Sequence, residues 1–184
     1  MLRLLDFALA AIGLLLLLPL LLLLLLFGLF DTGAPLFRQQ RVGRQQKPFV
    51  LLKLRTMRPD TASVATHLAN PAAVTPYGRF LRRSKLDELP QLWNVLKGEM
   101  SLVGPRPCLP NQTELVQERE RRGVFAMRPG ITGLAQVQGV DMSEPARLAE
   151  LDAQMLRQLD FWLYLKLIAL TLTGRGAGDR VRTP

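Results

Sequence analysis

The chain has 184 residues, enough for one modest domain plus an anchor, and its 24 Lys and Arg against 15 Asp and Glu give a formal charge of +9. Such an excess implies an anionic partner: nucleic acid, anionic lipid or a phosphorylated substrate. The lone Cys108 excludes an internal disulfide and indicates a reducing compartment. His67 is the single histidine of the sequence, which argues against a His-based zinc site and against Ser–His catalysis. We interpret it as a surface residue.

A leucine-rich apolar run begins the chain. Residues 7–30 carry no charge, and at about 1.5 Å per residue they give about 36 Å of helix, enough to cross about 30 Å of hydrocarbon. The run is too long for a signal peptide and does not end in small residues. Pro19 lies near its middle and would kink or break the helix. Length alone favours a kinked spanning helix over a re-entrant hairpin.

The charges beside this run favour the hairpin. Arg3 precedes the run, and four cations follow it: Arg38, Arg41, Arg44 and Lys47. Positive residues near a membrane segment mark the cytoplasmic side, so both ends are drawn to that side. Pro19 also divides the run into two arms that are each too short to cross. We therefore predict that the segment enters and leaves on the cytoplasmic face.

Several later segments have readable patterns. Residues 49–55 predict a short strand or buried segment that carries Lys53 and Arg55. The charged residues 112–122 predict a solvated helix. The apolar residues 161–173 are too short to span and predict a core or interfacial helix, with Trp162 and Tyr164 at the headgroup level. Residues 175–184 are rich in Gly and Arg and are expected to form a basic, flexible tail.

Two adjacent carboxylates, Asp87 and Glu88, precede Pro90 and an apolar helical pattern that ends at Gly98. Because Pro favours the first turn of a helix, the pattern places both carboxylates at a helix N-terminus, where the macrodipole favours ionised acids. A solvated acidic helix start is the simpler interpretation of this segment alone. Cations on both sides favour a site for Mg²⁺ and phosphates instead, since Mg²⁺ is typically held by one or two carboxylates plus phosphate oxygens. These cations are Arg79, Arg82, Arg83 and Arg106.

Six segments in order resemble one family, the bacterial sugar transferases, and specifically the small monotopic phosphoglycosyl transferases. The matching segments are residues 35–43, 53–57, 75–82, 86–98, 100–107 and 128–136. The resemblance implies transfer of a sugar phosphate from a UDP-sugar to undecaprenyl phosphate, with release of UMP. It also implies a Mg²⁺ requirement, an active site on the cytoplasmic face of the bacterial inner membrane, and the first membrane step of a cell-surface glycan pathway.

The resemblance assigns roles to individual residues. Asp87 would attack the phosphate proximal to the sugar and form a covalent phosphosugar intermediate, while Glu88 would ligate Mg²⁺ beside it. Four cations would bind phosphate oxygens, or alternatively phospholipid headgroups: Lys53, Arg55, Arg82 and Arg106. Five residues of a Pro-Gly turn would contact the nucleotide: Arg128, Pro129, Gly130, Thr132 and Gly133. The glycines of this turn allow close approach of a ligand to the backbone.

Two departures from the family pattern limit the resemblance. Leu18 rather than serine precedes Pro19, which weakens the evidence for a re-entrant break. Residues 152–155 read Asp-Ala-Gln-Met where the family commonly has Asp followed by paired tyrosines, so the sugar is not carried over.

We therefore expect a mainly α fold with minor β structure. Residues 1–34 form a re-entrant membrane helix broken at Pro19, and residues 35–174 form a catalytic domain docked at the membrane interface through amphipathic helices. The expected partners are a UDP-sugar, undecaprenyl phosphate, membrane phospholipid and a second copy of the chain, but no nucleic acid. The alternative is a non-enzymatic membrane adaptor whose basic domain binds anionic lipid or nucleic acid.

Overall fold

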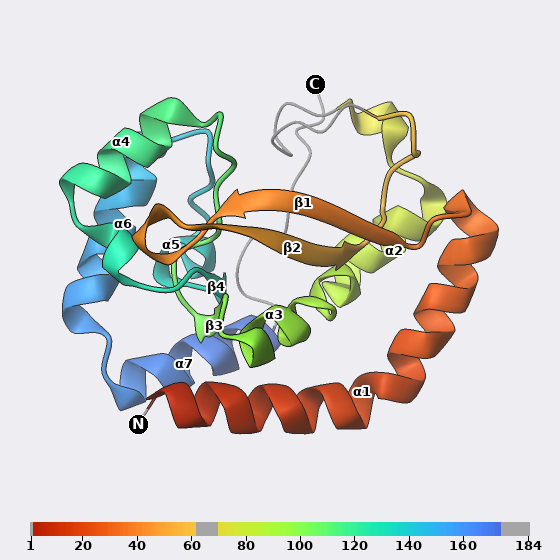
Figure 1. The fold of residues 1–184 in the computed structure, drawn as a ribbon, viewed down its shortest axis with the longest axis horizontal. Coiled ribbons are helices and arrows are strands. Elements are labelled where there is room, and N and C mark those ends of the chain that lie inside the picture. The colour runs from red at the N-terminus through yellow and green to blue at the C-terminus, as the bar shows by residue number, and fades with distance from the viewer. Residues whose placement is uncertain (1, 62–69, 174–184) are drawn as a thin grey trace.

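Helix α1 (Leu2–Thr32) is long and apolar, and it bends so that its two arms meet at an angle (Figure 1). The structure is a computed structural model that describes residues 2–61 and 70–173. Pro19 lies inside α1 and lacks the N–H for a helical hydrogen bond, and proline is one of the few established causes of a sharp helix bend. We attribute the bend to Pro19, although the helix does not end there. The helix has the length and hydropathy needed to cross a membrane.

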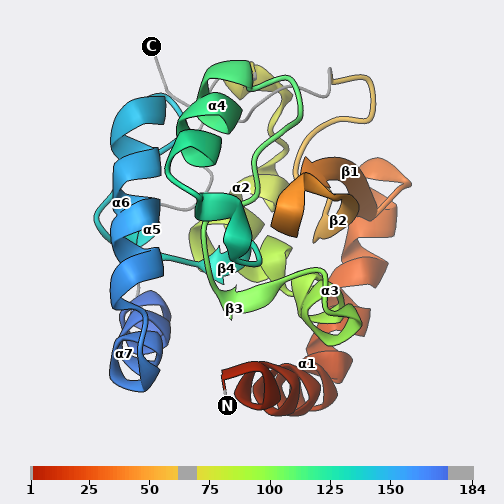
Figure 2. The same ribbon diagram turned by 60° about the vertical axis from the view of Figure 1, so that its left-hand side comes forward.

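The rest of the described chain lies in the angle between these arms (Figure 1, Figure 2). It is mainly helical with two small sheets, which confirms the predicted fold class at this level. The helices are α2 (Pro76–Ser84), α3 (Gln91–Lys97), α4 (Thr113–Arg121), α5 (Leu134–Val137), α6 (Pro145–Gln158) and α7 (Phe161–Leu172). The strands are β1 (Leu36–Val42), β2 (Pro48–Leu54), β3 (Ser101–Val103) and β4 (Gly130–Thr132). Short 3₁₀ turns are η1 (Arg44–Gln46), η3 (Pro71–Ala73), η4 (Leu86–Glu88) and η5 (Val124–Ala126).

Strands β1 and β2 form an antiparallel hairpin in which Phe37 lies opposite Lys53. Alternate residues of β2, including Phe49 and Lys53, are buried, which is the period-2 pattern of a strand with one covered face. The turn of the hairpin places Gln45 and Gln46 in the left-handed region, with φ of 54° and 58°. The strand predicted at residues 49–55 is therefore confirmed, and its cation Lys53 points inward.

Strands β3 and β4 pair in parallel, with Ser101 opposite Gly130. A Cβ added at Gly130 would lie 2.0 Å from the backbone nitrogen of Gly104, and one at Gly133 would lie 2.4 Å from the Gly104 carbonyl oxygen. These glycines are needed because the two backbones approach closely, independently of any ligand.

The N-terminal arm of α1 is attached to the domain by charged residues. Arg3 donates hydrogen bonds to the carbonyls of Val95 (2.7 Å) and Met100 (3.2 Å). Asp6 is 3% exposed and accepts three kinds of hydrogen bond: from the Ser101 hydroxyl (2.9 Å), the Leu102 N–H (2.8 Å) and the Tyr164 hydroxyl (2.7 Å). We call these groups the Asp6 network. This network joins α1 to β3 and α7.

The C-terminal arm of α1 is attached mainly by neutral contacts. Leu24 packs with Leu54 and Leu81 in a buried apolar cluster. The Tyr77 hydroxyl donates to the Leu24 carbonyl at 2.7 Å. Near the end of the helix, the Thr75 hydroxyl donates to Asp31 at 2.8 Å. Both arms of α1 therefore contact the same domain.

Two helices predicted from charge and hydropathy are present, but each buries a residue that we did not expect to be buried. In α4, Arg119 is 2% exposed, so the prediction of a wholly solvated helix is wrong. In α7, Trp162 is 75% exposed, whereas Tyr164 is 1% exposed and cannot lie at a headgroup level. Both buried residues have carboxylate partners on distant elements, Asp152 and Asp6, and sequence periodicity does not reveal such partners.

Two further predictions concern residues outside the described ranges. His67 belongs to residues 62–69, and the predicted flexible tail of residues 175–184 follows the last described residue.

Candidate active site

The two predicted catalytic carboxylates lie in the 3₁₀ turn η4, not at the start of a helix. Lys85 adopts a left-handed conformation (φ 58°), which ends α2 and begins η4. Helix α3 then begins at Gln91, with Pro90 immediately before it. The prediction of a helix N-terminus at Asp87 and Glu88 is therefore wrong, because both carboxylates lie in the 3₁₀ turn η4 and residues 89 and 90 separate that turn from α3. A non-glycine residue at positive φ costs free energy, and such strain tends to occur at functional sites.

Both carboxylates are largely withdrawn from solvent. Asp87 is 4% exposed, and the Glu88 side chain is 13% exposed. Arg106 Nη2 lies 2.7 Å from Glu88 Oε1, which joins two residues that the sequence proposed separately. The interpretation of a solvated acidic helix start is therefore wrong.

Two elements that carry predicted phosphate-binding cations pack against η4: β2 with Lys53 and α2 with Arg82. Lys53 is 8% exposed, and its Nζ lies 5.5 Å from the centroid of the Phe37 ring. Arg82 Nε donates to the Thr56 hydroxyl at 2.9 Å. Lys53 and Arg82 thus lie on two elements that pack against the carboxylate turn, and Arg106 reaches the same turn from residues 105–107.

Arg55 has a contact of a different kind. Its Nε donates to the Ala34 carbonyl at 2.7 Å, and its guanidinium lies 5.4 Å from the Phe37 ring centroid. These contacts hold the connection between α1 and β1. Binding of phosphate by Arg55 remains a prediction.

The residues predicted to contact a nucleotide are spread over several environments. Arg128 Nε donates to the Gly98 carbonyl at 2.9 Å, and burial, then the charges of Arg3 and Arg44, lowers the pKa of Arg128. The hydroxyl of Thr132 pairs with that of Thr171, on α7. Gly130 and Gly133 pack on the backbone of Gly104, as described above.

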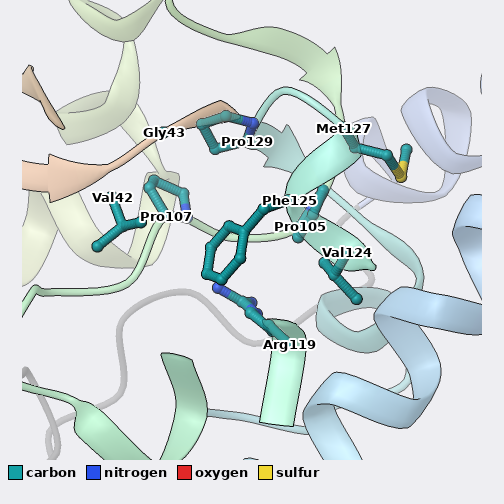
Figure 3. Close-up of a pocket in the computed structure, with 9 residues that line it drawn as sticks. All are labelled: Val42, Gly43, Pro105, Pro107, Arg119, Val124, Phe125, Met127 and Pro129. Carbon is teal, nitrogen blue, oxygen red and sulfur yellow. The ribbon is translucent and has the colours of Figure 1, made fainter. Parts of the chain in front are cut away.

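Pro129 is the member of that set that lines a pocket (Figure 3). The pocket lies between the end of β1, residues 105–107 and η5. Figure 3 shows the Arg119 guanidinium directed at the ring of Phe125 inside it. The other lining residues are Val42, Gly43, Pro105, Pro107, Val124 and Met127.

The donor set at η4 is suited to Mg²⁺ rather than to a metal held wholly by protein. No group of three or more His, Cys, Asp or Glu that could hold a metal is found in the part of the chain that the structure describes. Magnesium commonly binds through one or two carboxylates and completes its shell with water and substrate phosphate. Asp87 and Glu88, with Arg106 on one Glu88 oxygen, fit that pattern.

Sequence reasoning missed the residues that support the site. Asn94 is 0% exposed; its side chain accepts from the Leu52 N–H (3.1 Å) and donates to the Val50 carbonyl (2.8 Å) and to Glu99 (2.7 Å). It therefore holds β2 against α3. Trp93, one of the residues of the apolar helical pattern before Gly98, is 51% exposed. The sequence did contain one indication of the role of Asn94, because it is a polar residue within an apolar helical pattern.

Helix α1 is long and apolar enough to cross a membrane, and the carboxylate turn carries Arg106 on Glu88. The chain belongs to the bacterial sugar transferase family, whose sequence profile matches residues 1–175.

Three relatives illustrate the match. A UDP-glucose:undecaprenyl-phosphate glucose-1-phosphate transferase of Caulobacter vibrioides is 41% identical over 182 residues, or 92% of this chain and 67% of that protein. The sugar transferase EpsL of Bacillus subtilis is 42% identical over 141 residues, or 76% of this chain and 69% of EpsL. The Escherichia coli UDP-glucose:undecaprenyl-phosphate glucose-1-phosphate transferase is 37% identical over 179 residues, or 91% of this chain. The chain spans 38% of that longer protein.

Proposed function

We propose that this chain transfers a sugar phosphate from a UDP-sugar to undecaprenyl phosphate and releases UMP. The observation that carries the proposal is the withdrawn Asp87–Glu88 pair, with Arg106 on Glu88 at 2.7 Å and the elements of Lys53 and Arg82 beside it. The names of the Caulobacter and Escherichia relatives supply the donor and acceptor classes.

The reaction proceeds in two displacements at phosphorus. The Asp87 carboxylate attacks the phosphate that carries the sugar, the bond between the two phosphates breaks, and UMP leaves with the bonding electron pair. A terminal oxygen of undecaprenyl phosphate then attacks the phosphorus of the aspartyl phosphosugar and releases the carboxylate. A covalent intermediate divides one difficult transfer into two easier steps. Lys53, Arg82 and Arg106 bind the phosphate oxygens and offset the charge that develops in each transition state.

Glu88 and Asp87 would hold Mg²⁺ together with the donor's phosphates. When bound, the ion neutralises charge on the diphosphate and on the departing UMP. Arg106 keeps one Glu88 oxygen in a fixed direction before substrate arrives.

We also propose that α1 is re-entrant, with the catalytic domain at the cytoplasmic membrane interface. The attachment of both arms to the same domain supports this, because a spanning α1 would carry one end about 30 Å away across the hydrocarbon. Asp6 supports it as well, since an ionised carboxylate in hydrocarbon is costly unless it is paired. The exposed Trp162 suits the headgroup region.

Intact-protein mass spectrometry tests the covalent step. Wild type incubated with Mg²⁺ and a panel of UDP-sugars, without lipid acceptor, should gain the mass of one sugar phosphate. Asp87→Asn should gain none and should lose at least about a thousandfold in UMP release, because the amide keeps the shape but is not a nucleophile. Asp60→Asn, which changes an exposed carboxylate in the same way, is the matched control and should behave like wild type.

Turnover by Asp87→Asn at a rate near that of wild type would reject the covalent route. If no UDP-sugar yields UMP even with undecaprenyl phosphate present, the transferase function itself fails and the adaptor interpretation gains support.

A further inference from the structure

The turn that carries Arg106, residues 105–107, is held by groups outside itself. Two of its three residues are prolines, which have no N–H to donate. The backbone carbonyls of residues 105–108 each accept a hydrogen bond from another part of the chain. Pro105 accepts from the Gly130 N–H (2.9 Å), Arg106 from Arg119 Nη1 (2.8 Å), Pro107 from Arg41 Nη1 (2.9 Å) and Cys108 from the Val42 N–H (3.0 Å).

The donor to the Arg106 carbonyl is itself fixed by a buried ion pair. Arg119 on α4 is 2% exposed, and Asp152 on α6 is 1% exposed. Arg119 Nη2 and Nε lie 2.7 and 2.9 Å from the same Asp152 oxygen, Oδ2. Burial is the largest single influence and by itself lowers the pKa of Arg119, but Asp152 and Cys108 together raise that pKa above its ordinary value, so the guanidinium stays charged.

Stability alone is a weak reason to keep such a pair. Burying two charges costs several kcal/mol in desolvation, and well-packed apolar residues often replace a buried pair without loss of stability. The planar guanidinium does something an apolar side chain cannot: it pairs with a carboxylate along one edge and donates to a backbone carbonyl from Nη1. Here that carbonyl belongs to the residue whose side chain reaches Glu88.

We propose that Arg119, oriented by Asp152, is a positioning residue that sets the Arg106 side chain against Glu88. This rests on the proposed function, in which Arg106 and Glu88 serve the phosphates and Mg²⁺. Arg41, which is 6% exposed and also donates to Gln39, does the same for the neighbouring Pro107 carbonyl. The chain of contacts runs from α6 through α4 to the turn and then to η4. Arg119 itself touches no reacting atom.

The test is a double-mutant cycle on UMP release by the full chain in lipid nanodiscs. Arg119→Lys keeps the charge beside Asp152 but cannot hold both partners, and it should lower kcat/KM by roughly 10- to 100-fold, because small misplacement of a binding group has effects of that size. In an Arg106→Ala background the same change should have an effect of less than about twofold. Arg121→Lys is the matched control on α4, since its side chain is 70% exposed and pairs with Glu118.

Equal losses in both backgrounds would overturn the proposal, because Arg119 would then act independently of the Arg106 side chain. Asp152→Asn provides a second route if Arg119→Lys unfolds, as judged by thermal melting. It should give a smaller loss that also vanishes in the Arg106→Ala background. UMP release by the wild type tests the proposed transferase function, whereas the double-mutant cycle tests whether Arg119 acts through Arg106. Failure of the first is therefore distinguishable from failure of the second.

Discussion

The two arms of α1 are attached to one domain by different chemistry. The N-terminal arm is held by the Asp6 network and by Arg3, whose partners are buried polar groups on β3, α3 and α7. The C-terminal arm is held by leucine packing, by the Tyr77 hydroxyl and by the Asp31–Thr75 hydrogen bond. Apolar packing also occurs against lipid, whereas Asp6 finds its donors only in this domain. The N-terminal attachment is therefore the specific one.

The difference in how strongly the two arms are attached should be largest when the carboxylate of each arm, Asp6 or Asp31, is removed. Asp6→Ala leaves the Ser101 and Tyr164 hydroxyls and the Leu102 N–H without their acceptor, and it should lower the free energy of unfolding by about 3–5 kcal/mol. Asp31→Ala removes one hydrogen bond to Thr75 and should cost about 1 kcal/mol. Chemical denaturation in detergent measures both. Equal losses would mean that the two arms are held alike.

Straightening α1 should move the N-terminal arm away from the domain. In a Cys108→Ser background, Leu2→Cys should resist an impermeant maleimide on intact cells until the cells are permeabilised, because the proposed re-entrant helix keeps both of its ends on the cytoplasmic side. Pro19→Leu restores the missing helical hydrogen bond and should expose that cysteine to the outside. The control is Leu18→Ala, which changes a neighbouring side chain of α1 without altering its backbone hydrogen bonds. Labelling of the Pro19-containing protein from outside would show that α1 spans.

The smallest difference should appear at alkaline pH, in the two tyrosines. Burial and then Asp6 raise the pKa of Tyr164, and burial and then Asp31 raise that of Tyr77. A pKa raised in the folded state gives stability that is complete below the unfolded value, about 10, and is lost as pH rises above it. Melting temperatures from pH 8 to 11 should fall less steeply for Tyr164→Phe than for wild type, with a weaker change for Tyr77→Phe. Parallel curves for all three proteins would show that titration of these tyrosines does not contribute to the loss of stability at alkaline pH.

Local patterns predicted the elements of this fold well. The apolar run of residues 49–55 predicted a strand or buried segment and corresponds to β2, and Gly98 ends α3 with φ of 83°, as the helical pattern predicted. The motif residues Asp87, Glu88 and Arg106 were also found from sequence, and the structure joins the last two directly.

Long-range pairing was out of reach of the same reasoning. In the sequence, Arg119 is one charge among many in a polar helix, and Asp152 is the first residue of a segment that then departs from the family pattern; only the structure pairs the two. The left-handed conformation of Lys85 is a similar case, because a lysine in the sequence does not predict a positive φ. These features depend on partners far along the chain or on tertiary strain, which local propensity does not encode.

The partners of the Asp6 network impose an order on how the protein is made. Asp6 and Tyr164 are separated by 158 positions, so the ribosome synthesises nearly the whole chain before the hydroxyl that Asp6 binds exists. The apolar helix meets the membrane early in translation, but its N-terminal arm gains its complete attachment only when α7 has emerged. A chain that stops before α7 therefore lacks the hydrogen bond from Tyr164 to Asp6, and of the polar contacts described above its N-terminal arm keeps those of Arg3 and of the β3 donors.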